Sequence, residues 1–537
     1  MPPLGRPAAL ALALCAVTLT AGQGCSLLVE HDAVQCNVDA DCTKRGFTGA
    51  VCGAQKTCVV TNASECTVNA DCKSQPAICR KTDRKCVPLL TPECAKTVGP
   101  ATDDNAVLLG SIFSLKGTNA SAGQARENSA EAALSDITRD VVGLPAVTAG
   151  GKPRPLALVS CTDNDGSKDV GDVAAQHLRE LGIQAVIGPG SSGLVTTVSQ
   201  NVTVPAGMFL ITPSATSTSL SGQSLVWRTA PSDTVQAIAL SASVPEMEAK
   251  YRVDNAIPMA TAINLAVVYK DDAYGAGLFN AVAPTLSING KPVTDATNTI
   301  HFKGVKYAAT ATDPDYQAIV TDLASTFHPN LVVLFGTAEV ITKVLSPLEA
   351  AWPAMGFKRP AYLLSDGGRK PELTAACMGN DPLRVRLRGT VPGTNSANFG
   401  RFKLNYTSKY MGAYPDVFGM AGAYDSVYLL ALTISSLGQA PITGAAIEGA
   451  MAKTVGGTKF TFGVDKTQDA IATITSGKAL DVDGASGPLD FDLKAHEAPS
   501  DIDVWCVTSV NGTPTYTSSG RFYDAANKGM SGIFNCN

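Results

Sequence analysis

The sequence predicts an α/β protein with two doubly wound, Rossmann-like lobes that follow a small disulfide-rich segment. Three observations support this prediction. Cysteines are concentrated between residues 25 and 95, apolar runs of strand length alternate with helical patterns from residue 105 onward, and a second such series begins after residue 232. Strands that alternate with helices form parallel sheets covered on both faces, so each series predicts one lobe. A chain of 537 residues is also too long for one ordinary domain.

Residues 1–24 have the pattern of a signal peptide. Arg6 precedes an apolar run over residues 8–21, which is too short to span a bilayer. The following Gly24-Cys25-Ser26 resembles the lipobox of bacterial lipoproteins, although Gly22 stands where that motif prefers leucine. The resemblance implies an exported chain that is lipidated at Cys25 and thereby anchored to a membrane. Simple secretion after removal of the signal is the alternative.

Residues 25–95 contain an internal repeat. The stretch Cys36-Asn-Val-Asp-Ala-Asp-Cys42 recurs as Cys66-Thr-Val-Asn-Ala-Asp-Cys72, and each copy belongs to a group of four cysteines. This segment has too few aliphatic residues for a core, so we expect disulfides to stabilise it in an oxidising compartment. No metal is expected, because no Cys-x2-Cys pair occurs. Four cysteines allow three pairings, and the sequence does not choose among them.

The remaining cysteines lie nearer the α/β part of the chain. Cys506 and Cys536 flank the C-terminal strands and are expected to pair with each other. Cys161 is expected to pair with Cys94 or with Cys377. The count of cysteines leaves one that is unpaired or intermolecular.

The α/β part is expected to begin after a linker at residues 96–104. In the first series the expected strands are residues 106–113, 155–160, 185–188 and 208–211, and the expected helices are 123–137, 171–181 and 195–201. In the second series the expected strands are 264–269, 330–335 and 361–364, and the expected helices are 237–249, 274–286, 316–325 and 340–351. Short apolar runs bounded by turn residues are typical of buried parallel strands.

Residues 418–437 form an apolar stretch of membrane-like length whose single charge is Asp425. A buried helix of an α/β lobe has the same composition. We favour the buried helix, because periodic strands flank the stretch and no basic segment follows it.

Two loops of small residues follow neighbouring expected strands, within Ala185–Gly193 and Phe209–Ser217. The carboxyl ends of parallel strands meet at one edge of a sheet, where ligands bind. Hydroxyl and backbone N–H groups in such loops can hold a small anion without a buried cation. Because no catalytic base lies in either loop, they predict a binding site rather than a reaction centre.

Composition and motifs disfavour several functions. The formal net charge is −5, whereas a nucleic-acid partner requires a basic face. No P-loop, Gly-x-Ser-x-Gly or His-Glu-x-x-His motif occurs, and none of the five histidines lies in an expected cleft loop. We therefore expect neither an enzyme activity nor a cofactor.

Four segments stand in a specific order, namely AVIGPGSSG, FLITPSATS, LAVVYKDDAYGAGL and YLLSDGG. In this order and at this spacing they resemble type I periplasmic solute-binding proteins of ABC transporters, in the leucine/isoleucine/valine-binding-like family. Each motif is weak by itself, whereas the ordered set is specific. The resemblance covers residues 105–537 and leaves the cysteine-rich segment outside.

The resemblance implies two α/β lobes joined by three crossover strands, with the ligand between the lobes. The segments similar to the three crossings are residues 229–233, 389–395 and 487–492. They place lobe one at residues 105–229 plus 394–485, and lobe two at residues 230–393 plus 486–537.

The resemblance also implies site residues in lobe one. In amino-acid-binding relatives, hydroxyl and N–H groups of the two loops hold the ligand carboxylate, and here this role falls to Ser191 or Ser192 and to Thr216. Ser214 would offer its backbone carbonyl to the ligand ammonium. The alternative is that these residues only form tight turns and helix caps.

In lobe two the resemblance implies that Tyr274 closes over the ligand and that Asp366 pairs with its ammonium group. A helix-start packing residue and a turn residue, respectively, are the alternatives. Relatives often place aromatic residues near Ala122 and in the loop after Phe335, and this chain has neither. A branched-chain amino acid is therefore the family default and not a deduction from these residues.

The predicted function is that of an extracytoplasmic lipoprotein, periplasmic or anchored to the outer membrane, that captures a small polar ligand. The resemblance implies an amino acid as the ligand and an ABC permease or a sensor as the partner. The alternative is a non-transport envelope protein that uses the same fold as a protein-interaction or regulatory scaffold.

Overall fold

The computed structural model describes residues 34–47, 50–60, 65–73, 76–148, 150–353, 356–393, 397–412, 414–463 and 466–536. The expected signal peptide at 1–24 and the expected lipidation at Cys25 lie outside these residues. The chain divides into two compact units, Met1–Glu65 and Cys66–Asn537, which are described separately.

The described part of the first unit is a small disulfide-linked module. It consists of α1 (Asp39–Lys44) and of the antiparallel strands β1 (Ala50–Cys52) and β2 (Cys58–Val60). Disulfides join Cys36 to Cys52 and Cys42 to Cys58. The Asp41 carboxylate accepts hydrogen bonds from the backbone N–H groups of Asn37 and Val38, at 2.9 and 3.2 Å, and so caps the start of α1.

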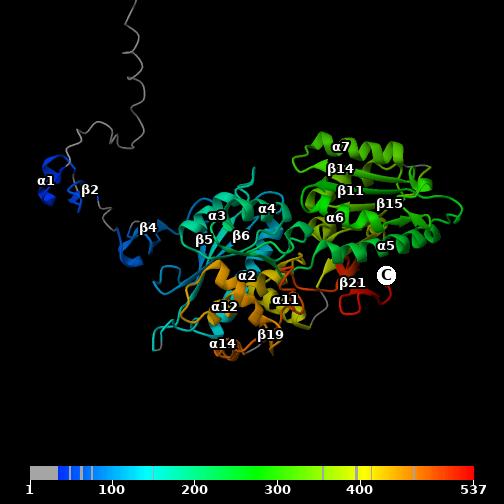
Figure 1. The fold of residues 1–537 in the computed structure, drawn as a ribbon. Coiled ribbons are helices and arrows are strands. Elements are labelled where there is room, and N and C mark those ends of the chain that lie inside the picture. Colours follow the sequence, from blue (N-terminus) through cyan, green and yellow to red (C-terminus); the bar gives the residue numbers. More distant parts are fainter. Residues whose placement is uncertain are drawn as a thin grey trace, which may run out of the picture. The chain divides into compact units, whose positions relative to one another are not determined.

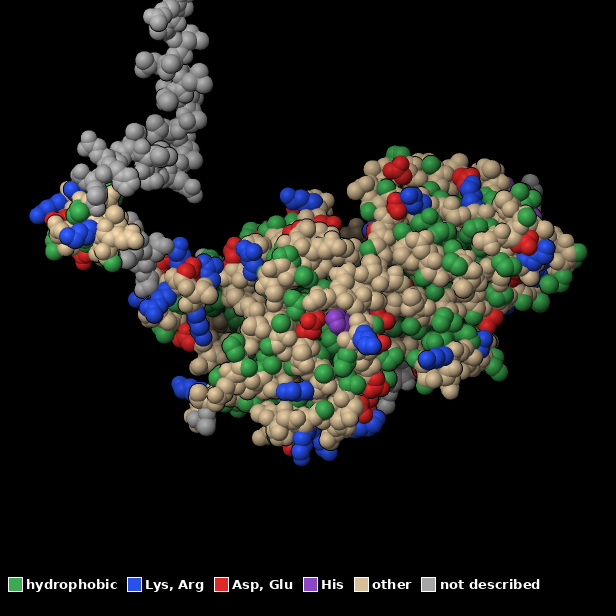
Figure 2. Space-filling view, viewed as in Figure 1, with side chains coloured by type: hydrophobic (Ala, Val, Ile, Leu, Met, Phe, Trp, Pro, Cys, Tyr) green, Lys and Arg blue, Asp and Glu red, His purple; other side chains and the backbone are tan. Residues whose placement is uncertain are grey.

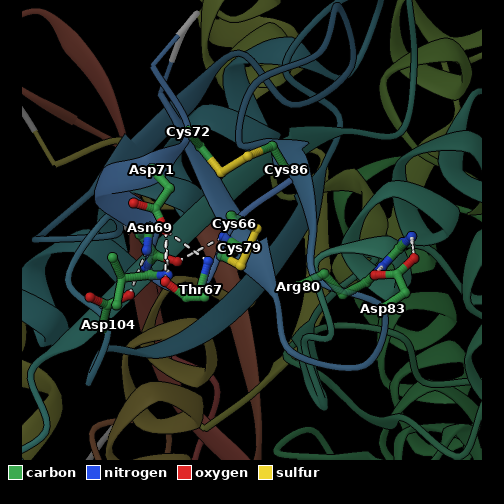
Figure 3. Close-up of a disulfide and its surroundings, with 11 residues drawn as sticks. Cys66, Thr67, Asn69, Asp71, Cys72, Cys79, Arg80, Asp83, Cys86 and Asp104 are labelled. Carbon is green, nitrogen blue, oxygen red and sulfur yellow. Dashed lines mark hydrogen bonds and ion pairs between the residues drawn. A yellow bond between two sulfur atoms is a disulfide. The ribbon is translucent and has the colours of Figure 1, made fainter. Parts of the chain in front are cut away.

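The second repeat, at the start of the second unit, is built in the same way. It contains η1 (Asn69–Asp71) and the antiparallel strands β3 (Ala77–Arg80) and β4 (Lys85–Pro88). Figure 3 shows its disulfides, Cys66–Cys79 and Cys72–Cys86. In both repeats the first cysteine pairs with the third and the second with the fourth. The structure thus confirms the expected disulfides and selects one of the three pairings.

The second repeat is attached to the α/β part of its unit. Leu89 belongs to the same apolar cluster as the first sheet, and its carbonyl oxygen lies 3.2 Å from Nε2 of His177. The backbone N–H of Asn69 donates to the Asp104 carboxylate at 2.7 Å (Figure 3). The repeat is therefore an integral part of this unit.

Two further disulfides join cysteines that are farther apart in the sequence. Cys506 pairs with Cys536, as expected, and Cys161 pairs with Cys94, one of the two partners considered. Cys377 is the free cysteine among the described residues.

The prediction that residues 96–104 form a linker is wrong in part. Lys96–Val98 forms β5, which pairs antiparallel with β7 (Leu156–Thr162) at the edge of the first sheet. A run of three residues has no readable period, so its neighbour in the sheet decides its conformation.

The first lobe is built on a six-stranded sheet of order β10-β9-β8-β6-β7-β5, parallel except for β5. Its other strands are β6 (Val107–Phe113), β8 (Ala185–Ile187), β9 (Phe209–Thr212) and β10 (Val226–Arg228). The helices of this lobe are α2 (Ala120–Asp140), α3 (Gly171–Glu180), α4 (Ser192–Val198), α11 (Ala397–Tyr410), α12 (Met420–Ser436), α13 (Gly444–Ala450) and α14 (Thr467–Thr475). A separate parallel pair is formed by β18 (Thr458–Thr461) and β19 (Leu480–Asp483).

Both faces of this sheet are covered. On β6, Leu109 belongs to the apolar cluster formed with α2 and α12, whereas Ile112 belongs to the cluster formed with α3 and α4. Figure 1 shows these helix pairs on opposite sides of β6. The lobe is therefore doubly wound, as predicted.

The second lobe has an eight-stranded sheet of order β14-β11-β15-β16-β17-β20-β21-β22, parallel from β14 to β17 and antiparallel from there on. Its strands are β11 (Leu265–Asp271), β14 (Phe302–Ala308), β15 (Leu331–Phe335), β16 (Ala361–Leu364), β17 (Leu387–Pro392), β20 (Ile502–Val510), β21 (Thr513–Asp524) and β22 (Gly529–Ser531). Its helices are α5 (Asp233–Asp254), α6 (Gly275–Val282), α7 (Asp313–Asp322), α8 (Ser346–Ala351), α9 (Pro371–Ala376) and α10 (Asp381–Arg384). The neighbours Val267 and Val268 enter opposite apolar clusters, so this sheet is also covered on both faces.

The chain passes between the two sheets three times. Strand β10 of the first sheet is followed by α5, which packs on the second sheet. Strand β17 of the second sheet is followed by α11, which packs in the first lobe. Strand β19 of the first lobe precedes β20 of the second sheet. The first two are the crossings that the sequence resemblance implies. The third lies later than the predicted residues 487–492, because Leu489, Phe491 and Ala498 still pack in the core of the first lobe, so the predicted start of lobe two at residue 486 is too early.

Helix α12 lies in the core of the first lobe, with its residues from Met420 to Ser435 buried. The interpretation of this apolar stretch as a buried helix is therefore confirmed. Among the described residues, no helix has both the length and the apolar character needed to span a membrane.

The buried Glu127 is expected to make the folding stability of the protein depend on pH. It is buried on α2 next to Ser111 and Ser160, and burial raises the pKa of its carboxyl to about 7, although both hydroxyls lower it. Between its ordinary pKa of 4.5 and about 7, only the folded state keeps this proton, so stability falls as pH rises through that window and then levels off. We expect Glu127→Gln to remove up to about 3 kcal/mol of this fall, as measured by guanidinium unfolding at pH 5 and pH 8.

The matched control for this experiment is Glu180→Gln, which changes an exposed glutamate on α3 of the same lobe. This variant should show the parent pH dependence. An equal pH dependence in Glu127→Gln and the parent would contradict the assignment.

Candidate functional site

A cavity of about 530 Å³ lies between the two lobes. Its walls come from the loops after β6, β8 and β9 of the first sheet and from the loops after β11, β15 and β16 of the second. These are the carboxyl ends of parallel strands, and the volume suits a small organic ligand. A separate void of about 30 Å³ at the crossings has room only for water.

Three of the predicted lobe-one residues, Ser191, Ser192 and Ser214, line this cavity. Ser191 is the N-cap of α4, and its hydroxyl oxygen accepts from the N–H of Leu194 at 3.4 Å. The Ser192 hydroxyl accepts from the N–H of Ser217 at 3.2 Å. Because both oxygens act as acceptors, their protons remain available for a ligand anion. The capping role of Ser191 and a ligand role are therefore compatible.

The Ser214 hydroxyl offers the cavity an acceptor oxygen and not a free proton. Its hydroxyl donates to the carbonyl of Gly190 at 2.8 Å, so its proton is already used and its lone pairs remain. Such an oxygen suits an ammonium ligand better than a carboxylate. The predicted contact between the backbone carbonyl of Ser214 and a ligand ammonium group stays a prediction.

The structure places Thr216 outside the cavity lining. It is fully buried, and its carbonyl accepts from the N–H of Asp233 at 2.8 Å, where the chain enters α5. Its position supports the first crossing rather than a contact with a ligand.

The two predicted lobe-two residues are in direct contact with each other. The Tyr274 hydroxyl donates to Oδ1 of Asp366 at 2.8 Å and accepts from the N–H of Gly367 at 3.0 Å. It also lies 2.7 Å from the Ser365 hydroxyl. Position 367 requires glycine, because a Cβ there would lie 2.3 Å from the carbonyl oxygen of Gly336. Tyr274 therefore fixes Asp366 at the cavity wall.

Burial raises the pKa of Asp366 above its ordinary value, against the opposing effects of Tyr274, Gln236 and Arg126. Asp233 is a fully buried neighbour, and burial together with the charge of Asp366 raises its pKa to about 8. Both carboxyl groups therefore bind a proton more readily than an exposed aspartate, and the Tyr274 hydroxyl favours the ionised form of Asp366.

The cations of the site were not predicted from the sequence. Arg126 and Lys370 line the cavity, whereas the argument from small loops required no buried cation. Lys370 follows the predicted Asp366 by four positions in the same strand-end loop, which was an available signal. Arg126 had none, because a single arginine in a helical stretch is most often a surface residue.

The aromatic residues of the cavity also come from unexpected positions. Tyr316 on α7 and Phe418, just before α12, line it. Position 122, where an aromatic was sought, is a fully buried alanine. The chain therefore has aromatic surface in the cavity, supplied by other elements than those considered.

The family described as receptor family ligand binding region matches residues 126–509. No curated protein sequence matches this chain.

Solved structures with the same fold include bacterial solute-binding proteins. The branched-chain amino acid transporter substrate binding protein LivJ from Streptococcus pneumoniae, in complex with isoleucine, is 20% identical with a TM-score of 0.54, over 77% of this chain and 99% of that one. The leucine binding protein LivK from Thermotoga maritima is 17% identical with a TM-score of 0.54, over 77% and 98%. A solute binding protein of an ABC transporter from R. palustris, in complex with benzoate, is 14% identical with a TM-score of 0.53, over 80% and 99%. The predicted type I periplasmic-binding-protein fold is confirmed.

Proposed function

We propose that this chain, which belongs to the family of receptor ligand-binding regions, captures a small polar solute between its two lobes. The observation that carries the proposal is the cavity of about 530 Å³, which has free hydroxyl protons on one wall and a positioned carboxylate on the other. An oxyanion and a cation in one small molecule would satisfy both walls. No step of bond making or breaking is part of this function.

The solute that fits these walls is an amino acid. Its carboxylate would accept hydrogen bonds from Ser191 and Ser192, and its ammonium group would pair with Asp366 and the Ser214 oxygen. Closure of the lobes would remove these charged contacts from water and so strengthen them. Tyr274 acts through Asp366, which it holds in place.

The cellular role that we propose is capture outside the cytoplasm. The six disulfides of the described residues are typical of exported proteins. Lipidation of Cys25 would tether the protein to the cell envelope, in the periplasm or at the outer membrane. The bound solute would then be delivered to an ABC permease or reported to a sensor.

The cysteine-rich repeats favour one alternative, a scaffold that binds another protein. They form ordered modules outside the family match, and solute capture does not require them. In this alternative the cavity would have no solute of its own.

A thermal-shift screen tests the proposal. We expect one class of amino acid or related acid to raise the Tm of the parent chain, since a hundredfold excess over Kd adds about 2.7 kcal/mol of stability. We expect Asp366→Asn to abolish the shift, because an amide carries no charge for the ammonium group. Asp381→Asn, which changes an acid on α10 that is 76% exposed, is the control and should retain the shift.

Two outcomes would contradict this assignment. If no solute shifts the parent, the scaffold alternative is favoured. If Asp366→Asn retains a full shift with an amino acid, Asp366 is not the ammonium partner.

A further inference from the structure

One ion pair joins the two lobes beside the cavity. On the face shown in Figure 2, basic and acidic side chains lie together at the surface. The pair between Nη2 of Arg369 in lobe two and Oδ1 of Asp416 in lobe one, at 2.8 Å, is instead largely shielded from water, because only 7% and 19% of the two side chains are exposed. Breaking such a pair leaves a poorly solvated charge without its partner, so the pair resists separation of the lobes.

Arg369 is positioned by the same turn of lobe two as the predicted ligand carboxylate. Its N–H donates to the carbonyl of Asp366 at 3.0 Å, at the end of η8 (Asp366–Gly368). Its guanidinium lies over the Tyr516 ring, 5.2 Å from the centroid. The Tyr516 hydroxyl accepts from the N–H of Lys370 at 2.8 Å and donates to its carbonyl at 2.7 Å. A displacement of Arg369 is therefore passed to Asp366.

Asp416 belongs to a segment of lobe one that reaches lobe two. Its neighbour Val417 is part of the apolar cluster of the first lobe, whereas Phe418 packs against the cluster of the second. These two apolar residues line the cavity, but Asp416 does not. The segment thus connects the lobes along the cavity wall, and the charge of Asp416 acts on lobe two from outside the ligand contacts.

The same segment is anchored to the ligand-binding side of lobe one. The carbonyl of Phe418 accepts from Nε of Arg126 at 3.0 Å, and Arg126 lines the cavity. Position 419 requires glycine, because its φ is +89° and a Cβ there would lie 2.5 Å from Cβ of Ser214. Since both ends of the ion pair are held next to predicted site residues, the pair ties one wall of the cavity to the other.

The ion pair also lies beside the crossings of the chain. Arg369 and Asp416 line the small void of about 30 Å³ together with residues 229–231 and 391–393 of the first two crossings. A contact beside the segments about which two lobes turn fixes the angle between the lobes. A small change of this angle becomes a larger displacement at the far side of the cavity, so the pair can control how closely the walls meet.

The lobes touch at a second place when the ion pair is formed. A Cβ on Gly277 of α6, in lobe two, would lie 3.3 Å from the Ser217 hydroxyl oxygen of lobe one. Gly277 follows the predicted Tyr274, and Ser217 follows the predicted Ser214. The arrangement that contains the ion pair is therefore one in which the ligand-binding loops of the two lobes are in contact.

We propose that the ion pair between Arg369 and Asp416 stabilises the closed arrangement of the lobes and thereby raises the affinity for the solute. Asp416 then determines affinity without contacting the ligand. The apparent affinity of a ligand falls with the fraction of protein in the binding-competent arrangement, so loss of the pair weakens every solute by the same factor. The effect on affinity rests on the proposed function, whereas the effect on the lobes requires no ligand.

Hydrogen exchange of the ligand-free full chain tests the effect on the lobes in Asp416→Asn. Residue 416 has a φ of 55°, which asparagine adopts as readily as aspartate, so the substitution removes only the charge. We expect amides at the start of α6 to exchange about threefold faster than in the parent, because they lose their contact with lobe one. Asp381→Asn is the control, since it breaks an ion pair of the same length, with Arg384, inside lobe two.

A double-mutant cycle separates the ion pair from other effects of each residue. Arg369→Gln should speed exchange at the start of α6 as Asp416→Asn does, and the double variant should speed it no further, because the pair is already broken. Additive effects of the two substitutions would overturn the pair as the cause. Exchange at parent rates in Asp416→Asn would overturn the inference.

Isothermal titration with L-leucine and L-glutamate tests the effect on affinity. We expect Asp416→Asn to weaken each amino acid that binds the parent by the same factor, about fivefold or more, and Asp381→Asn to retain the parent affinity. A loss for only one of two bound amino acids, an affinity within about twofold of the parent, or tighter binding would overturn the inference and leave the proposed function intact. If neither amino acid binds the parent, the amino-acid assignment fails, and the exchange experiment alone decides the role of the ion pair.

Discussion

Replacing Cys94 and Cys161 together by alanine is expected to lower the free energy of unfolding of the second unit by about 4 kcal/mol. The two residues are 67 positions apart, and a cross-link over such a span removes much of the conformational entropy of the unfolded chain. Both are fully buried between the second cysteine repeat and the first sheet, so their loss also weakens packing there. Guanidinium unfolding of the full oxidised chain would measure the change.

The matched control is the double variant Cys36→Ala with Cys52→Ala. This disulfide lies in the first unit, so its removal should leave the main unfolding transition of residues 66–537 unchanged. A main transition that is equally stable without Cys94–Cys161 would mean that this link stabilises only its immediate surroundings.

Asp425→Ala is expected to cost about 3 to 5 kcal/mol of stability. Asp425 is fully buried on α12, and its carboxylate accepts from the N–H groups of Ala485 and Ser486, both at 2.7 Å, and from the Ser486 hydroxyl at 2.6 Å. Alanine would remove the acceptor of these three bonds inside the protein. Burial raises the pKa of Asp425 from 3.8 to about 6 although the three donors lower it, so the parent loses stability as pH rises through that window and the variant should differ most from the parent below it.

Chemical unfolding at about pH 4 measures this effect, and a repeat at pH 8 should show a smaller cost. Asp469→Ala, on the exposed side of α14 in the same lobe, is the control and should change stability by no more than about 0.5 kcal/mol. A loss below about 1 kcal/mol for Asp425→Ala would show that water replaces the carboxylate as acceptor.

The single charge in an otherwise apolar stretch illustrates what the sequence could and could not predict. Flanking strands were sufficient to predict that α12 is buried. The reason for Asp425 was not readable, because its partners are 60 and 61 positions away. The same contrast applies to β6 and β5, since a strand of seven apolar and small residues identifies itself whereas Lys96–Val98 depends on its neighbour.

The candidate site also combines features that the sequence predicts with features that depend on tertiary contacts. Ser191, Ser192 and Ser214 follow strand ends of one sheet, so the topology of parallel sheets was sufficient to predict that they meet. Tyr274 and Asp366 belong to the other sheet, and only the family resemblance predicted that they face the same cavity. Their roles as ligand contacts remain predictions. The charge balance of the cavity could not be predicted, because whether a lysine or arginine has a counterion is a tertiary property.

The second cysteine repeat is attached to the first lobe and not to the second, which has a consequence for the lobe closure proposed above. Strand β5 and the Cys94–Cys161 link join this repeat to the first sheet. Whatever restrains the N-terminal end of this unit therefore restrains the first lobe, so the lobe closure proposed above would displace the second lobe relative to it. Under the proposed function, a permease or sensor that distinguishes the occupied protein would then respond to the position of the second lobe.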